Sequence, residues 1–155
     1  MTTIEKEPKA KESKAKELLP KKPSVLLKLA LKDLESCRSS PDYVIDMDIW
    51  HYSDGETCNV CLAGAVMSQT LGLEPAESLS IGPWSTGGLT DNVRNRLLAL
   101  NHFRCGNLLS GLNKLSCKKP KDLPETVRIT QYGTSPEKFL ADMYKLVETF
   151  ERFDI

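Results

Sequence analysis

The chain has 155 residues, of which 40% are hydrophobic and 27% are charged, and its formal net charge is zero. This length predicts one domain, and this composition is typical of a globular protein rather than a fibrous or wholly disordered one. No apolar run approaches the roughly 20 residues that a membrane-spanning helix needs, and no export signal opens the sequence. We therefore expect a cytoplasmic protein that does not enter a membrane.

Residues 1–22 differ in composition from the rest. They carry seven Lys and four Glu, which leaves a net charge of −3 on the remainder of the chain. This segment holds too little apolar area to offset the entropy of ordering it, so we predict a disordered charged tail over 1–22 and a single globular domain over 23–155. The mildly acidic domain argues against nucleic acid as a general partner, because binding phosphates needs a clustered basic face.

The first part of the domain is predicted to contain helix, strand and helix. Apolar residues recur at helical spacing over 24–38. Over 43–50 they alternate with polar residues, which is the period of a strand, and Ser-Asp-Gly at 53–55 ends that strand with a turn. The apolar run over 61–67, with Gly72 beyond it, predicts a tightly packed central helix.

The second part of the domain is predicted to be mainly helical. After an ordered loop over 73–90, Asp91 can cap a helix, and a shorter helix is expected at 107–114. A short strand at 125–131 precedes a Ser-Pro pair at 135–136 that opens the clearest helix of the chain. The sum is an α+β fold, mostly α, in which four to five helices pack with a small two- to three-stranded antiparallel sheet.

Two pairs of Cys and His residues have the spacing of zinc-binding knuckles. They are Cys58-x-x-Cys61 and His102-x-x-Cys105, and four ligands of these types could close a tetrahedral zinc site. Free cysteines are also among the most buried residue types, so thiols packed in the core explain the same pattern without a metal. A zinc-stabilised domain that contacts nucleic acid is thus one alternative.

A cysteine nucleophile is a second alternative. Cys58 or Cys61 near a helix N-terminus could have a lowered pKa, with His51 or His102 as its base. Neither histidine stands in a recognisable catalytic motif, and the sequence shows no complete nucleophile or acid–base arrangement. We therefore predict no catalytic residue and no cofactor, with zinc and a cysteine-dependent enzyme as the alternatives.

Other conspicuous residues have a structural and a functional interpretation. Trp84, in the glycine-rich stretch 82–88, is a candidate partner contact because aromatic residues dominate binding hot spots; alternatively, it pins this loop onto the core. Trp50 and His51 are interpreted as a buried aromatic residue beside a hydrogen-bonded histidine. Asp46-Met47-Asp48 is interpreted as the solvated face of a strand rather than as a magnesium site.

A two-part motif covers residues 45–51 (IDMDIWH) and 58–67 (CNVCLAGAVM). It resembles a motif in small uncharacterised proteins of bacteriophages and prophages. The resemblance implies a phage or prophage origin and a strand-turn-helix unit in which Trp50 packs against the Leu-Ala-Gly-Ala helix, and it transfers no catalytic residue. We therefore predict a non-enzymatic protein that acts by protein–protein interaction, as a phage-encoded modulator of a host process or defence system, with a host or phage protein as its partner.

Overall fold

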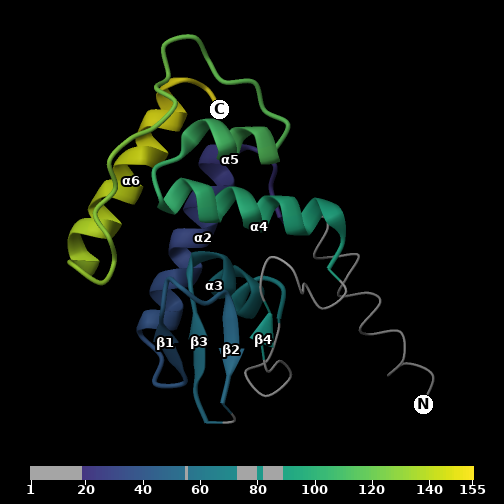
Figure 1. Ribbon diagram of the computed structural model, residues 1–155, viewed down its shortest axis with the longest axis vertical. Coiled ribbons are helices and arrows are strands. Elements are labelled where there is room, and N and C mark those ends of the chain that lie inside the picture. The colour runs from purple at the N-terminus through teal and green to yellow at the C-terminus, as the bar shows by residue number, and fades with distance from the viewer. Residues whose placement is uncertain (1–18, 55, 73–79, 82–88) are drawn as a thin grey trace.

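The computed structural model describes residues 19–54, 56–72, 80–81 and 89–155. In this part of the chain, a small sheet with one helix forms a lower half, and further helices form an upper half (Figure 1). Helix α2 (Pro23–Arg38) extends along both halves. None of the described helices is long and apolar enough to cross a membrane.

A mixed sheet with the strand order β1-β3-β2-β4 lies in the lower half. Its strands are β1 (Tyr43–Ile45), β2 (His51–Ser53), β3 (Cys58–Val60) and the two-residue β4 (Ser80–Ile81). β1 and β3 are parallel, whereas β2 is antiparallel to β3 and to β4. The predicted purely antiparallel pairing is therefore wrong, because β3 lies between two strands that precede it in the sequence.

The chain passes from β1 to β2 through a turn, where the sequence predicted a continuous strand. The backbone N–H of Asp48 donates to Asp46 Oδ1 at 3.0 Å, and that of Ile49 donates to the Asp46 carbonyl at 3.2 Å. An aspartate that binds the backbone two residues ahead is a local turn signal. Asp46 and Asp48 consequently belong to this turn rather than to the face of a strand.

Helix α3 (Leu62–Gln69) packs closely against the sheet, and its residues from Leu62 to Ser68 are buried. Gly64 makes this approach possible, since a Cβ atom at that position would overlap the carbonyl oxygen of Trp50 and lie 3.0 Å from Cβ of Val60. Glycine is the residue that lets two backbones come this close. The predicted buried central helix is confirmed.

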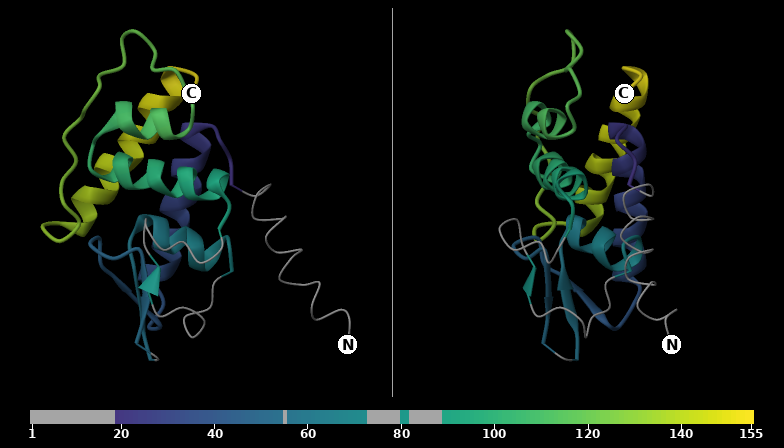
Figure 2. Two further views of the ribbon diagram at one scale, coloured as in Figure 1. Left: turned by 45° about the vertical axis from the view of Figure 1, so that its right-hand side comes forward. Right: turned by 90° about the vertical axis from the view of Figure 1, so that its right-hand side faces the viewer.

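The upper half contains α4 (Asp91–Arg104), α5 (Leu108–Lys114) and α6 (Pro136–Arg152). Figure 2 shows these helices in two layers, with α2 and α6 side by side in one and α4 and α5 in the other. Phe103 of α4 and Phe150 of α6 join the layers, with ring centroids 5.1 Å apart in an edge-to-face arrangement.

Side-chain caps begin the two long helices of the upper half. The Ser135 hydroxyl accepts the backbone N–H of Lys138 at 3.2 Å, and Pro136 follows at the first helical position, as predicted. For α4, the capping oxygen belongs to Thr90, one residue before the predicted Asp91, and accepts the N–H of Val93 at 3.4 Å. Asp91 lies instead in the first turn, where its charge favours the helix dipole.

The segment predicted as a strand at 125–131 forms only a single bridge, between Asn107 and Thr126. The Glu125 carbonyl accepts the N–H groups of Leu108 and Leu109 at 2.9 and 3.0 Å. This segment therefore binds free backbone N–H groups at the start of α5 instead of pairing with a strand. Across the described residues, five helices and a small sheet make the fold α+β and mostly α, as predicted.

Candidate functional site

The four predicted zinc ligands lie on separate parts of the fold. Cys58 is buried in β3 and Cys61 is buried just before α3, whereas His102 lies in the last turn of α4 and the exposed Cys105 follows that helix. Among the described residues, no group of three or more His, Cys, Asp or Glu side chains is placed to hold a metal ion. The described residues therefore do not bring the four predicted ligands together as a metal site.

A polar cluster is buried between the sheet and α3. At its centre, Nε2 of the fully buried His51 lies 2.8 Å from Oγ of Ser68, and Sγ of Cys58 lies 3.4 Å from the same nitrogen. Burial lowers the pKa of His51, which keeps the ring neutral at pH 7. Trp50 is 5% exposed, so the interpretation of Trp50 and His51 as a buried aromatic beside a hydrogen-bonded histidine is confirmed.

The three buried thiols are held in the protonated form. Burial raises the pKa of Cys37 to about 12 and that of Cys58 to about 11. Cys61 precedes α3, where the backbone N–H groups of Ala63 and Gly64 favour a thiolate, but complete burial outweighs them and raises its pKa. Because the thiolate is the nucleophilic form of cysteine, this arrangement supplies no activated nucleophile at neutral pH.

A buried carboxyl group joins α2 to the end of α3. Oδ2 of Asp33 accepts the Thr70 hydroxyl at 2.5 Å, and nearby Nε2 of Gln69 donates to Sγ of Cys37 at 3.6 Å. Burial raises the pKa of Asp33 to about 6, although the Thr70 hydrogen bond and the charge of Lys32 lower it. These part-buried contacts hold α2 and the end of α3 together.

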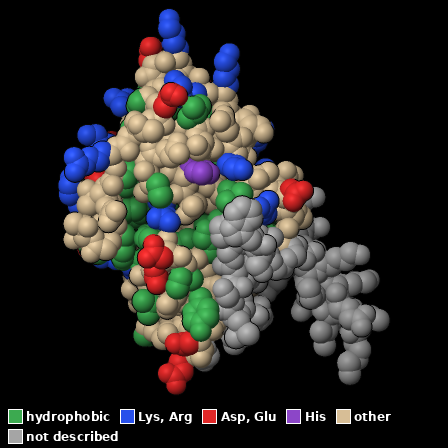
Figure 3. All heavy atoms as spheres, in the orientation of Figure 1, with side chains coloured by type: hydrophobic (Ala, Val, Ile, Leu, Met, Phe, Trp, Pro, Cys, Tyr) green, Lys and Arg blue, Asp and Glu red, His purple; other side chains and the backbone are tan. Residues whose placement is uncertain are grey.

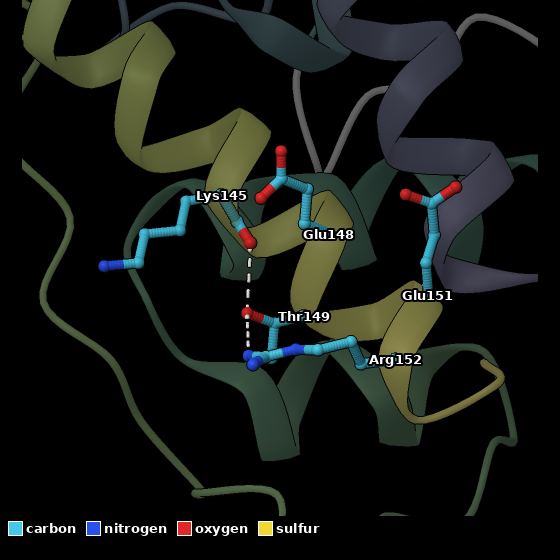
Figure 4. Close-up of a pocket in the computed structure, with 5 residues that line it drawn as sticks. All are labelled: Lys145, Glu148, Thr149, Glu151 and Arg152. Atoms are coloured by element: carbon cyan, nitrogen blue, oxygen red, sulfur yellow. Dashed lines mark hydrogen bonds between the residues drawn. The ribbon is translucent and has the colours of Figure 1, made fainter.

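A hollow of about 500 Å³ lies on the surface of α6 (Figure 4). It is lined by Lys145, Glu148, Thr149, Glu151 and Arg152. The Thr149 hydroxyl donates to the Lys145 carbonyl at 3.0 Å and accepts from Nη2 of Arg152 at 3.4 Å. All five residues belong to one helix and their charges are mixed, so the hollow lacks the converging polar groups of a catalytic pocket.

One face of the sheet exposes two apolar side chains, Val44 and Tyr52, on either side of Asn59. Val44 of β1 pairs with Asn59 of β3, and Asn59 pairs with Tyr52 of β2, so the three side chains are neighbours on the same face. Val44 is 48% exposed and Tyr52 is 41% exposed, whereas His51 and Ser53 on either side of Tyr52 are buried. We call Val44, Asn59 and Tyr52 the outer sheet row, because it lies on the face opposite the buried polar cluster.

Acidic residues accompany the outer sheet row. Five carboxyl groups lie between residues 42 and 60, a stretch without Lys or Arg: Asp42, Asp46, Asp48, Asp54 and Glu56. Figure 3 shows hydrophobic and acidic side chains over the lower part of the molecule, whereas Lys and Arg are concentrated over the upper half. This part of the surface therefore combines two exposed apolar side chains, on either side of the amide of Asn59, with carboxyl groups in the turns beyond the strands.

Sequence reasoning did not single out the outer sheet row as a contact surface. A signal was present, since the chain has no Lys or Arg between Arg38 and Arg94 and therefore separates into an acidic and a basic part. The predicted contact residue Trp84 lies outside the described residues, as does the rest of 82–88.

Comparison of the chain with protein-family models, with curated proteins and with solved structures finds no significant match. The resemblance of residues 45–51 and 58–67 to phage proteins therefore stays a prediction.

Proposed function

We propose that this chain is a non-enzymatic binding protein whose outer sheet row contacts another protein. The observation that carries the proposal is the row itself, in which Val44 and Tyr52 expose apolar area on one sheet face. Apolar side chains that are grouped on a surface mark interaction sites, whereas scattered ones do not. Tyrosine also contributes a large contact area at a small cost in conformational entropy, and it is enriched among interface hot spots.

The surrounding charge defines the chemistry of the partner. Carboxyl groups lie beyond both ends of the strands that carry the row, with Asp46 and Asp48 in the turn after β1 and Asp54 and Glu56 in the turn after β2. A complementary surface presents an apolar side chain to Val44 and Tyr52 and places Lys or Arg around it. Such charges accelerate association and disfavour acidic competitors. The proposed partner is thus a protein with a basic binding surface.

The buried polar cluster is consistent with a binding role. The histidine and thiols that could serve as base and nucleophile are neutral and enclosed by the sheet and α3. The resemblance of the motif at 45–51 and 58–67 to phage proteins adds a biological setting, in which the partner is a host or phage protein and binding modulates a host process or defence system.

Site-specific photo-crosslinking tests the outer sheet row directly. A photoreactive phenylalanine replaces Tyr52, and the crosslinked partner is then measured for binding to the wild-type chain and to the double variant Val44→Ser/Tyr52→Ser. We expect the double variant to bind at least about tenfold more weakly, since it removes both apolar side chains of the contact. Val25→Ser is the matched control, because Val25 is 49% exposed on α2 and lies outside the row.

Two further measurements decide whether the contact is of the proposed kind. The melting temperature of the double variant should equal that of the wild type, which separates lost binding from lost folding. The association rate should fall with added salt, because the partner is expected to be basic. Undiminished binding by the double variant, or equal weakening by Val25→Ser, would show that the row is not the contact surface.

A further inference from the structure

Strand β1 forms one edge of the described sheet, where β3 is its only strand partner (Figure 1). Helix α2 packs against β1, but no described strand lies on its outer side. The opposite edge, at β4, borders residues outside the described ranges. An open edge presents backbone N–H and C=O groups with which another extended chain can pair. The edge of β1 is therefore a second surface, next to the outer sheet row, that is available to a partner.

The backbone groups of Ile45 point away from β3. The Asp42 carbonyl accepts a backbone N–H of β3 at 2.9 Å, and the N–H of Asp46 donates to a β3 carbonyl at 2.8 Å. Val44 between them also faces β3, because the polar groups of successive strand residues point to opposite sides. The N–H of Tyr43, on the outer side, already donates to the carbonyl three residues earlier at 3.4 Å. Among the described residues, the N–H and C=O of Ile45 have no backbone partner.

The side chains of β1 face two different environments. Ile45 is partly buried against the hydrophobic core, whereas Val44 is 48% exposed in the outer sheet row. A strand added beside β1 would place one of its side chains next to Val44 on the outer face and extend the row by one member. The edge and the row together supply what strand recognition needs, since backbone hydrogen bonds give affinity and neighbouring side chains give specificity.

Carboxyl groups at both ends of β1 define which chain fits this edge. Asp42 is exposed just before the strand, and Asp46 is partly exposed just after it. If a second copy paired antiparallel through its own β1, Asp42 of each copy would lie opposite Asp46 of the other, and like charges in that position destabilise a strand pair. Lys or Arg at the ends of the added strand would attract these carboxylates instead. We propose that the partner adds an extended segment with Lys or Arg at its ends to the edge of β1.

This inference rests on the proposed function, because it specifies how a basic partner of the outer sheet row binds. The probe is a peptide of alternating valine and threonine with a lysine at each end, about seven residues long. It is added to the full wild-type chain and followed by backbone-amide NMR. We expect saturable binding with its largest shift at the amide of Ile45, and weaker binding when glutamate replaces both lysines.

Two N-methylated forms of this peptide isolate the backbone hydrogen bonds. Methyl groups on alternate residues remove the N–H donors along one side of an extended peptide and leave the side chains unchanged. Only one of the two forms loses the donors that face β1, so it should bind at least about tenfold more weakly than the other. Because both forms are measured on the wild-type chain, this result does not depend on the folding of any variant.

A pair of substitutions tests the same hydrogen bonds from the side of the chain. Ile45→Pro removes the outward N–H and spares the hydrogen bonds of Val44 to β3. Ile45→Ala is the matched control, because it also loses side-chain packing but keeps the N–H. We expect Ile45→Pro to bind the peptide at least about tenfold more weakly than Ile45→Ala, with similar melting temperatures for the two variants.

The possible outcomes separate strand addition from the contact through the outer sheet row. No saturation at about 5 mM peptide, or equal affinity of the two methylated forms, would overturn strand addition alone. Binding weakened by Val44→Ser/Tyr52→Ser but equal in Ile45→Pro and Ile45→Ala would also overturn it and would place the contact on the sheet face. Binding that needs the Ile45 N–H but is unchanged by Val44→Ser/Tyr52→Ser would support strand addition and contradict the role of the row.

Discussion

The two halves of the molecule differ in whether their cores contain polar side chains. The upper half keeps its core almost entirely apolar, with Phe103, Phe139 and Phe150 packed among leucines. The lower half encloses His51 and Ser68 and pairs them with each other. A buried polar group must find its partner within the fold, so the lower half depends on exact placement of α3 against the sheet, whereas the upper half tolerates small shifts of its helices.

The largest effect on this difference is expected from a substitution that moves α3 away from the sheet. In Gly64→Ala the new methyl group would overlap the Trp50 carbonyl, so the helix must move and the hydrogen bond of His51 to Ser68 must lengthen or break. We expect a loss of about 4 kcal/mol in the free energy of unfolding, or complete loss of the fold.

Urea denaturation of Gly64→Ala should be compared with that of Gly133→Ala. Gly133 lies in the loop before α6, and a Cβ atom there meets nothing within 4 Å. That substitution should change stability by less than about 0.5 kcal/mol. Similar stabilities for the two variants would mean that α3 does not approach the sheet as closely as described.

A smaller effect should follow from the buried carboxyl group that ties α2 to α3. The pKa of Asp33 is raised from 3.8 to about 6, so the folded state favours the protonated acid. As the pH rises from about 4 to about 6, the unfolded state ionises first, and the contribution of Asp33 to stability falls before it levels off. Asp33→Asn removes this titration and should be more stable than the wild type above pH 6, by at most about 3 kcal/mol.

The difference between the two unfolding free energies, measured by urea denaturation from pH 4 to pH 8, isolates Asp33 from other groups. His51 acts in the opposite direction, because its lowered pKa makes the folded state less stable in acid, but it is present in both proteins and cancels. A difference that stays constant across this pH range would contradict the raised pKa of Asp33.

The smallest expected effect is a difference in the rates at which the cysteines of the two halves are alkylated. Cys105 is exposed and Cys117 is partly exposed, both in the upper half, whereas Cys37, Cys58 and Cys61 are buried next to the sheet. Mass spectrometry after brief alkylation should find label first on Cys105, then on Cys117, and on the other three only after unfolding. Rapid native labelling of Cys61 would instead support the cysteine-dependent enzyme and contradict the proposed binding role.

The sequence predicted the upper half better than the lower half for physical reasons. Local signals define helices such as α6, where the Ser135 cap and Pro136 mark the start and apolar spacing marks the buried face. Strand pairing is non-local, and nothing near β1 in the sequence reveals that β3 lies beside it in parallel. Asp46 was a local signal for the turn after β1, but the alternation of apolar and polar residues around it predicted a strand instead.

The candidate sites also differ in how far local sequence signals predict them. Cys58-x-x-Cys61 was recognised by spacing, but the distance between that pair and His102 depends on how α3 packs against α4, which spacing does not encode. Val44 and Tyr52 lie in one row only because β1 and β2 both pair with β3 at Asn59. By contrast, the burial of Trp50 and His51 was predictable, because an aromatic residue beside a lone histidine is usually part of a core.

The pairing of α2 with α6 also has a consequence for synthesis on the ribosome. Arg38 donates to Glu137 at 2.7 Å and Tyr144 donates to Glu35 at 2.6 Å, across separations of 99 and 109 residues. The part of α2 that packs against α6 therefore leaves the exit tunnel long before α6 has been translated. During that interval the nascent chain presents an uncovered apolar helix, the kind of segment that chaperones bind and that aggregation exploits.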